Sequence, residues 1–204
     1  VLCLFEDIGI QAVKVGMVFN VSIIKAIAQT FEAAQPDNVV IDPVMISKSG
    51  YSLLQPEAQQ ALVEILLPFA HVLTPNLMEA QAILGTQIQT VEEMKEAARA
   101  IRSLGPGSVV VKGGHLDLDR ATDVFFDGKM VHELPGTFTQ TKNTHGTGCT
   151  FSSAIAANLA LGKPLFEAVG QAKSYISEAI AHGLDIGKGH GPTHHFFGMK
   201  TVGG

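Results

Sequence analysis

The chain has 204 residues, of which 46% are apolar, and its formal net charge at pH 7 is −5. This length and apolar content suffice for one sizeable hydrophobic core, so we expect one domain over residues 1–204. The net negative charge argues against a nucleic-acid-binding protein, and no apolar run approaches the length of a membrane span. We therefore expect neither nucleic acid nor a membrane as a partner.

The start of the chain and its cysteines indicate where the protein works. The first residues do not show the order of a signal peptide, in which a charged segment is followed by an apolar segment and a cleavage site. Cys3 and Cys149 do not make a disulfide framework, so the sequence predicts a cytoplasmic protein. The chain begins at Val1, and its first nine residues look like the end of a helix leading into a strand, so we expect further residues before it.

Strands and helices are expected to alternate through the first half. Apolar runs rich in β-branched residues mark strands, and patterns with helical spacing mark helices. In chain order we expect a strand over 12–18, a helix over 21–34, a strand over 39–44, a helix over 56–66, a strand over 71–74 and a helix over 77–84. Pro56 is typical of the first turn of a helix and supports the start of the helix over 56–66, and Gly85 is typical of the residue that ends a helix and supports the end of the helix over 77–84.

The second half adds a hairpin and two long helices. We expect a helix over 90–104 that opens with a capping box, a strand over 108–112, strands over 122–126 and 129–134, helices over 150–161 and 165–182, and a glycine-rich loop over 187–198. Asp127-Gly128 between two strands is a strong hairpin signal. The alternation predicts an α/β fold with a mainly parallel sheet, and the hairpin is expected at its antiparallel edge.

Polar residues follow the expected strands at the edge where open α/β sheets bind ligands. Asp42 follows the second strand and Lys112 ends the fourth, while Asn76 and Glu79 follow the third. Two carboxylates and a lysine at one edge suit a metal-assisted phosphate site. Taken singly, Asn76 and Glu79 also match a helix capping box, Asp42 a simple turn, and Lys112 an exposed lysine before a loop. Their shared position after successive strands favours the functional interpretation.

The stretch 143-NTHGTGCTFSSAIAANLALG-162 is a glycine-rich loop that runs into a helical pattern. Gly146 and Gly148 have no side chains, so backbone amides can approach an anion closely, and the helix start adds the positive end of its dipole. The stretch has no Gly-Lys-Ser/Thr and is not a Walker A loop, and it lacks the third glycine of a dinucleotide fingerprint. The alternative is a tight turn into a buried helix of small residues.

Cys149 stands in the first turn of this helix, where a helix N-terminus stabilises a thiolate. A thiolate there could act as a nucleophile or take a proton from a substrate hydroxyl. The simpler interpretation, which is the one we apply to Cys3, is a small buried residue. His145 lies four residues before Cys149, so a Cys-His hydrolase is a further alternative, but it leaves the carboxylates and the lysine unexplained.

Six segments that run almost from end to end match one known family. They are 13-VKVGMV-18, 41-IDPVMISKSG-50, 73-LTPNLMEA-80, 111-VKGGH-115, 143-NTHGTGCTFSSAIAA-157 and 189-GHGPTHHF-196. In this combination the chain resembles the hydroxymethylpyrimidine (phosphomethylpyrimidine) kinases of thiamine biosynthesis, which belong to the ribokinase-like superfamily. Cys149 is typical of this branch, because most ribokinase-like enzymes carry an aspartate at that position.

The resemblance implies a ribokinase-like three-layer sandwich, in which helices cover both faces of a mostly parallel central sheet. It implies transfer of a phosphoryl group from ATP, with Mg²⁺, to the hydroxymethyl group of 4-amino-5-hydroxymethyl-2-methylpyrimidine and then to its monophosphate. It also implies a homodimer. The family's N-terminal part, with a first strand, a glycine loop and a glutamine near the pyrimidine, has no counterpart in this chain.

The resemblance also implies roles for individual residues. The anion hole would be Gly146, Thr147 and Gly148, the general base Cys149, and the phosphate lysines Lys112 and Lys173. Asn76, Glu79 and Asp42 would serve the nucleotide and Mg²⁺, with Glu79 and Asp42 holding the ion through water. The pyrimidine pocket would be Gly16, Met17 and Val44. Lys173 could instead lie on a solvated helix face, and the loop histidines His145, His190, His194 and His195 would only shape the rim of the site.

Two alternatives share much of this pattern. A cysteine-type pyridoxal kinase would have the same fold and chemistry but would act on a vitamin B6 hydroxymethyl group. A non-catalytic remnant would bind the pyrimidine or a nucleotide as a regulator. The presence of Cys149 together with Lys112 and Glu79 argues against the second alternative.

Overall fold

The computed structural model describes residues 1–46, 51–114 and 121–199. The strands are β1 (Val13–Val15), β2 (Val39–Ile41), β3 (Val72–Leu73), β4 (Ser108–Val111), β5 (Asp123–Phe126) and β6 (Val131–Leu134). The α-helices are α1 (Leu2–Asp7), α2 (Val21–Ala34), α3 (Pro56–Ala61), α4 (Leu77–Leu84), α5 (Val91–Arg102), α6 (Thr147–Ala160) and α7 (Leu165–Ala181). A π-helix, η1 (Leu62–Leu66), and a 3₁₀-helix, η2 (Leu67–Phe69), follow α3. No helix in the described ranges is long and apolar enough to cross a membrane.

The strands form one sheet in the order β1-β2-β3-β4-β5-β6. Strands β1 to β4 are parallel, whereas β5 and β6 pair antiparallel with their neighbours. The expected hairpin at an antiparallel edge is therefore confirmed. Its turn is held by Asp127 Oδ1, which accepts hydrogen bonds from the N–H groups of Lys129 and Met130.

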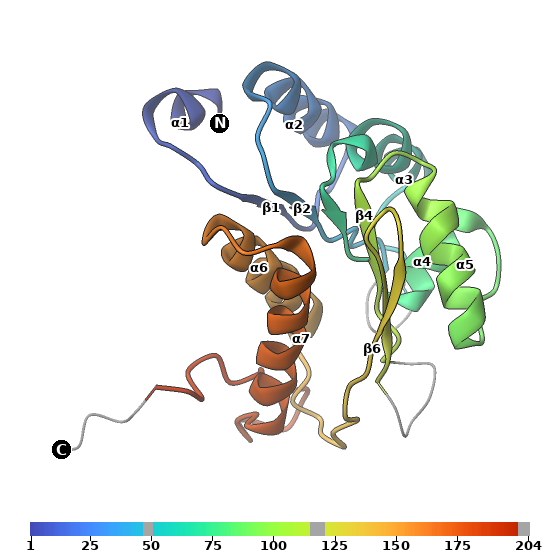
Figure 1. Cartoon of the computed structure of the whole chain (residues 1–204), viewed down its shortest axis with the longest axis vertical. Helices are drawn as coiled ribbons and strands as arrows, with labels where there is room; N and C mark the ends of the chain where they lie inside the picture. The colour runs from blue at the N-terminus through green and yellow to red at the C-terminus, as the bar shows by residue number, and fades with distance from the viewer. Residues whose placement is uncertain (47–50, 115–120, 200–204) are drawn as a thin grey trace.

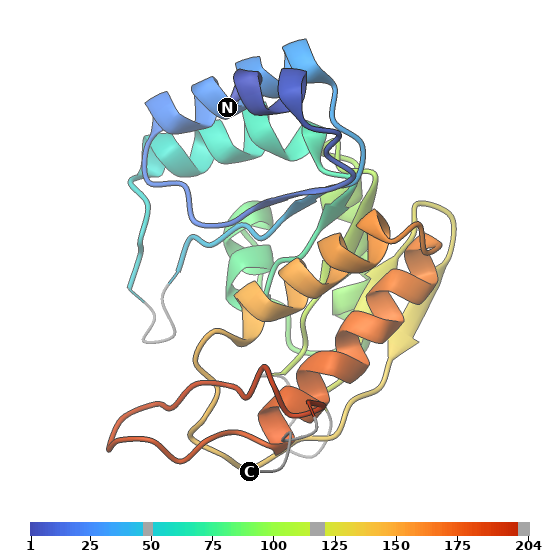
Figure 2. The same cartoon turned by 90° about the vertical axis from the view of Figure 1, so that its left-hand side faces the viewer.

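Helices cover both faces of this sheet (Figure 1). The parallel strands follow one another in chain order, and crossovers between parallel strands share one hand, so every crossover returns on the same face. That face carries α2, α3 and the α4–α5 pair, while α6 and α7 lie side by side on the opposite face (Figures 1 and 2). The expected three-layer α/β fold is thus confirmed.

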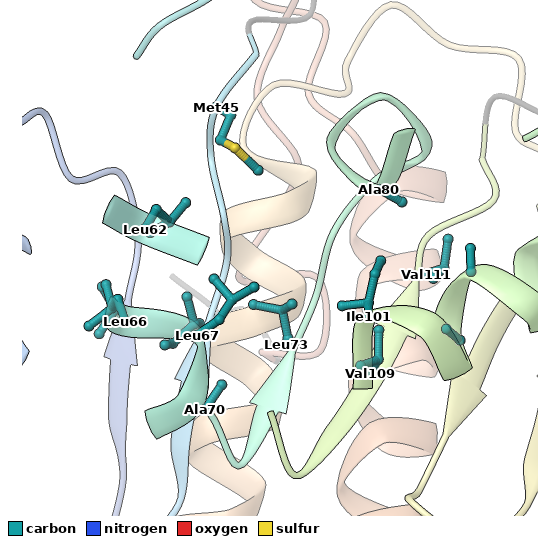
Figure 3. Close-up of a cluster of buried hydrophobic side chains, with 14 of the residues drawn as sticks. Met45, Leu62, Leu66, Leu67, Ala70, Leu73, Ala80, Ile101, Val109 and Val111 are labelled. Atoms are coloured by element: carbon teal, nitrogen blue, oxygen red, sulfur yellow. The ribbon is translucent and has the colours of Figure 1, made fainter. Parts of the chain in front are cut away.

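Alternate residues of each strand enter different hydrophobic cores, as the two-residue period of a strand requires. In β2, Val39 and Ile41 belong to the core beneath the crossover helices, whereas Val40 belongs to the core beneath α6 and α7. Figure 3 shows the first of these cores, where leucines of η1 and η2 pack near Leu73 and Val109 of the sheet. Because both faces are covered, the parallel strands are apolar along nearly their whole length.

Several elements differ from their expected bounds. The strands expected over 12–18 and 39–44 are too long, since β1 ends before Gly16 and β2 ends before Asp42, which precedes a proline that cannot donate to the sheet. The helix expected over 56–66 is α-helical only as far as Ala61 and continues as a π-helix. Helix α6 begins at Thr147 and not at Thr150, because Gly146 takes a left-handed φ of 83° and serves as its N-cap.

Candidate active site

The loop that precedes α6 presents amide donors to the carboxyl edge of the sheet. Thr147 Oγ1 donates to Thr144 O at 2.8 Å, and the Thr150 N–H donates to Gly146 O at 2.8 Å, which fixes the first turn. The N–H groups of a first helical turn have no acceptor within the helix, and Gly146 has no side chain that could cap them. The Thr147 N–H donates to Thr144 O at a long distance of 3.4 Å. The start of α6 therefore combines backbone donors that the helix itself leaves free with the positive end of the helix dipole.

Asp42 and Lys112 form a buried ion pair at the carboxyl ends of β2 and β4. Lys112 Nζ lies 2.9 Å from Asp42 Oδ1, and the side chains are 16% and 2% exposed. Burial acts to lower the pKa of Lys112, but the negative charges of Asp42 and Glu79 outweigh it, so this pKa lies above its ordinary value. Lys112 is therefore a fixed cation, and its interpretation as an exposed lysine before a loop is wrong.

Gly148 brings the start of α6 against this ion pair. A Cβ atom at Gly148 would lie 3.3 Å from Lys112 Nζ and 3.7 Å from Asp42 Oδ2. One turn further along α6, Ser152 Oγ lies 3.5 Å from Asp42 Oδ2 and donates to Gly148 O at 3.1 Å. The amide donors of the loop and the ammonium group of Lys112 therefore lie side by side, and both favour an anion.

Asn76 and Glu79 form a capping box at the start of α4. Asn76 Oδ1 accepts from the Glu79 N–H at 2.9 Å, and Glu79 Oε2 accepts from the Asn76 N–H at 2.7 Å. Burial raises the pKa of Glu79 to about 7 against the opposing Lys112 charge, and the nearby charge of Asp42 adds to the rise. The capping role is therefore real, and it places a buried carboxyl group within electrostatic reach of the ion pair.

Lys173 lies on α7 and is tied to the hairpin. Its Nζ atom lies 2.7 Å from Asp123 Oδ2 and donates to Ala121 O at 2.7 Å, and its side chain is 13% exposed. Its interpretation as a residue of a solvated helix face is therefore wrong. Asp123 Oδ1 accepts from the N–H of Gly113 at 2.9 Å, so the pair reaches the residue that follows Lys112.

Cys149 is exposed at one end of a pocket of about 620 Å³ between α6 and α7. The pocket is lined by Cys149, Thr150, Ser153, Ala154, Ala157, Asn158, Gln171, Tyr175 and His195. The interpretation of a small buried residue is therefore wrong for Cys149, and it is also wrong for Cys3, which is exposed. Within the described parts of the chain no hydrogen bond joins Cys149 to His145, whose backbone N–H instead donates to Gly191 O.

The residues proposed for the pyrimidine pocket lie at the carboxyl ends of two neighbouring strands. Gly16 and Met17 follow β1, Val44 follows β2, and the last residues of these strands, Val15 and Ile41, are paired. Met17 is 54% exposed, so its thioether is available to a ligand, and Val44 is half-buried. These residues therefore stand beside Asp42, at the same edge as the ion pair.

Two residues of this region were missed by the sequence reasoning. Asp123 is a buried carboxylate at the first position of an otherwise apolar strand, and that contrast was a signal in the sequence. Asn143 is also buried, beside the loop that it opens, and nothing in its local sequence indicates this. The four loop histidines form no metal cluster with other ligand side chains in the described ranges.

Comparison with known proteins assigns this arrangement to a family. The family described as phosphomethylpyrimidine kinase matches residues 1–194. The chain belongs to this family. A hydroxymethylpyrimidine/phosphomethylpyrimidine kinase of Rhizobium meliloti (strain 1021) is 50% identical over 195 residues, which cover 94% of this chain and 73% of the relative.

Two solved structures are similar to this phosphomethylpyrimidine kinase family member. The phosphomethylpyrimidine kinase of Clostridium difficile 630 is 44% identical with a TM-score of 0.77, and the match covers 87% of this chain and 72% of that one. The pyridoxal kinase of Staphylococcus aureus in complex with AMP-PCP and pyridoxal is 37% identical with a TM-score of 0.89, and the match covers 98% of this chain and 72% of that one. The chain is a phosphotransferase with the ribokinase-like fold.

Proposed function

We propose that this protein phosphorylates 4-amino-5-hydroxymethyl-2-methylpyrimidine and then its monophosphate, with ATP as the phosphoryl donor. The observation that carries the proposal is the approach of Gly148, at the start of α6, to the Lys112–Asp42 ion pair. Phosphoryl transfer needs in-line positioning and stabilisation of negative charge, and fixed amide donors beside a fixed cation supply both. The 50% identity to a kinase of this name supports the choice of substrate.

Each residue of the loop has one task in this proposal. The amides of Gly146, Thr147 and Gly148 hold the oxygens of the transferring phosphoryl group. Cys149, in the same helical turn, accepts the proton of the substrate hydroxyl as its oxygen attacks phosphorus. A positioned base contributes on the order of a hundredfold or more to the rate.

The two lysines balance charge on the nucleotide side. Lys112 is held by Asp42 and so keeps its ammonium group in place when the phosphates arrive. Lys173 offsets the negative charge of Asp123, which would otherwise add to the charges of Asp42 and Glu79 around Lys112. Charged donors fixed before the reaction cost no reorganisation in the transition state.

Asp42 and Glu79 fit a role in holding Mg²⁺ through water. Mg²⁺ keeps several waters and is bound through one or two carboxylates together with phosphates, and two carboxyl groups beside the expected phosphate position fit that pattern. The two carboxyl groups repel each other across a single lysine, and a divalent ion would offset this excess negative charge. The ion would supply neutralisation of the phosphate charge, while Asn76 holds Glu79 in place.

The pyrimidine ring is placed at the ends of β1 and β2. Exposed Met17 offers a polarisable thioether to the flat ring, and Gly16 and Val44 leave room beside it. In this proposal a ring at this position directs its hydroxymethyl group toward the start of α6, with Cys149 on the side of the attacking oxygen.

A pyridoxal kinase is the second candidate, and one observation favours it. The fold agrees more closely with the S. aureus pyridoxal kinase, at a TM-score of 0.89, than with the C. difficile phosphomethylpyrimidine kinase, at 0.77. Sequence identity favours the phosphomethylpyrimidine kinase, at 44% against 37% for the pyridoxal kinase. Both substrates carry a hydroxymethyl group on a nitrogen-containing aromatic ring, so the same loop and base would serve either substrate.

ADP release in the presence of Mg-ATP tests the proposal. Hydroxymethylpyrimidine, its monophosphate and pyridoxal are supplied separately to the wild-type protein, to Cys149→Ala and to Cys3→Ala, the last being a matched control because Cys3 is the other exposed cysteine. We expect turnover of both pyrimidines by wild type and Cys3→Ala. We expect a loss on the order of a hundredfold in Cys149→Ala.

The other outcomes separate the alternatives. Turnover of pyridoxal alone would move the substrate to vitamin B6 and leave the mechanism intact. No turnover by a folded protein that still binds a pyrimidine or ATP would show a regulatory binding protein. An unchanged rate in Cys149→Ala would remove the thiol from the mechanism.

We further propose a homodimer that works in the cytoplasm. The dimer rests on the family resemblance, and light scattering on the purified protein tests it by giving a mass twice that of the chain. The cytoplasm is supported by two cysteines that are both free in the structure, which suits a reducing compartment. Fractionation of cells that produce the full protein tests the location.

A further inference from the structure

The segment that follows α7 runs back beside the loop that leads into α6. Figure 2 shows the two stretches next to each other below the helices. The His145 N–H donates to Gly191 O at 3.0 Å, and His145 forms a parallel β-bridge with Pro192. The backbone directly before the anion-binding loop is therefore paired with a distant part of the chain.

Both ends of this contact are anchored further. Lys142 Nζ lies 2.7 Å from Asp185 Oδ1, which adds an ion pair between the two stretches. The His194 N–H donates to Ala179 O at 2.9 Å, which attaches the returning segment to the last turn of α7. The returning segment therefore links the last turn of α7 to the loop before α6.

Asn143 is the residue through which the two stretches interlock. It is 6% exposed and lies against Gly183 and Gly191 of the returning segment. A Cβ atom at Gly191 would overlap Asn143 Oδ1 and lie 2.9 Å from its Cγ, and a Cβ atom at Gly183 would lie 2.8 Å from the Cβ of Asn143. Neither glycine has a left-handed φ, so it is space alone that requires glycine at these positions.

Packing holds the Asn143 side chain in this slot. Its Oδ1 atom has no hydrogen-bond partner within the ranges that the structure describes. The conformation of the side chain thus depends on the slot between the two glycines. The backbone that carries it is also held by hydrogen bonds, from the Asn143 N–H to Thr141 Oγ1 at 3.1 Å and from the His145 N–H to Gly191 O. A change that fills the slot must displace Asn143, because no hydrogen bond of Oδ1 holds it in place.

We propose that Gly183 and Gly191 are positioning residues for phosphoryl transfer, because the slot that they form around Asn143 sets the position of the loop 144–148. The proposal rests on the function proposed above for that loop. The substrate ring is assigned to the ends of β1 and β2, away from the slot, so filling the slot changes the chemical step and leaves ring binding intact.

The test compares two alanine substitutions in the same segment. Gly191→Ala fills the slot, whereas Gly189→Ala is a matched control, since a Cβ atom at Gly189 meets nothing within 4 Å and its φ is not left-handed. For both variants kcat, KM for hydroxymethylpyrimidine and the melting temperature are measured. We expect kcat of Gly191→Ala to fall on the order of tenfold to a hundredfold with KM unchanged, and we expect Gly189→Ala to match wild type.

A second pair of variants identifies the cause. Asn143→Ala removes Oδ1 and Cγ, the two nearest atoms that a Cβ at position 191 would meet, and leaves Leu184 O at 3.0 Å. In an Asn143→Ala background the Gly191→Ala substitution should therefore lose most of its effect. Hydrogen–deuterium exchange of the peptide that contains residues 140–150 gives a readout that does not need activity. We expect faster exchange in Gly191→Ala than in Gly189→Ala.

Either of two results would overturn the inference. One is equal exchange and equal kcat in the two glycine variants. The other is a Gly191→Ala effect of the same size in the presence and absence of the Asn143 side chain. If the wild-type protein transfers no phosphate, the proposed function fails, and the exchange comparison still decides whether the slot positions the loop.

Discussion

At the scale of single residues, Lys112 and Asp42 depend on each other, because each would be an isolated buried charge without its partner. Replacing Lys112 with methionine leaves the carboxylate of Asp42 buried and unpaired. We expect Lys112→Met to lower the free energy of unfolding by about 3–5 kcal/mol. Urea denaturation followed by circular dichroism measures this change.

The double variant Lys112→Met with Asp42→Asn is the control for that loss. It removes both charges, so no unpaired charge remains in the interior, and much of the lost stability should return. Phosphoryl transfer should stay low in both variants, since neither keeps the cation. Equal stability of the single variant and the wild type would show that the ion pair is not structurally important.

Glu79 gives the protein a pH dependence of stability. Its pKa in the folded protein is raised by burial to about 7 from an ordinary value of 4.5, so the folded state favours the neutral carboxyl group. Stability contributed by this group is therefore fully present below pH 4.5 and is lost as the pH rises toward 7, by roughly 3 kcal/mol in total. Glutamine imitates the neutral form and still accepts the N–H of Asn76.

Glu79→Gln is compared with wild type without Mg²⁺ between pH 5 and pH 8. We expect the melting temperature of Glu79→Gln, relative to wild type, to rise between pH 5 and about pH 7 and to level off above it, where the carboxyl group has lost its proton in both the folded and the unfolded state. Thermal denaturation at several pH values measures the difference. A constant difference across the range would contradict the raised pKa.

At this scale the sequence allowed two interpretations of Asn76 and Glu79, as a capping box or as site residues. The capping box follows from local spacing and is present in the structure. The raised pKa depends on burial and on Asp42 and Lys112, which reach Glu79 only through the fold. Local sequence could predict the hydrogen bonds of Glu79 but not its electrostatic surroundings.

At the scale of elements, the start of α6 makes a testable contrast with the middle of α7. Gly148 and Gly170 are both helical, and alanine favours a helix over glycine by roughly 0.5–1 kcal/mol. A Cβ atom at Gly170 meets nothing within 4 Å, whereas one at Gly148 lies 3.3 Å from Lys112 Nζ. We expect Gly170→Ala to be slightly stabilised with full activity.

Gly148→Ala should behave differently, with a stability close to that of wild type and a kcat reduced at least about tenfold. The added methyl group lies where the loop amides and Lys112 meet, so it disturbs the place where the phosphate is expected. Steady-state kinetics and thermal denaturation on the two variants measure both effects. Full activity of Gly148→Ala would contradict the assignment of the anion hole to this turn.

The elements themselves could largely be predicted, because hydrophobic period and turn residues are local. The hairpin at Asp127-Gly128 and the helices α2, α4 and α7 are close to their expected ranges. The start of α6 was placed three residues too late, since the N-cap is a glycine with a left-handed φ and carries no capping side chain that a sequence pattern could show.

At the scale of the whole molecule, the parallel sheet explains why distant residues meet. Strands β2, β3 and β4 are parallel neighbours, so the residues that follow them gather at one edge, and this was predictable from strand order. The Lys173–Asp123 pair and the slot around Asn143 were not predictable, because each joins segments that are distant in sequence: the first joins α7 to β5, and the second joins the loop before α6 to the segment after α7.

Phosphorus NMR of hydroxymethylpyrimidine incubated with Mg-ATP and the protein tests the proposed function most directly. We expect a pyrimidine monophosphate that forms first and then converts to the diphosphate, with one ADP released at each step. Pyridoxal supplied at the same concentration should react more slowly. Formation of pyridoxal phosphate with no phosphorylated pyrimidine would contradict the proposed substrate.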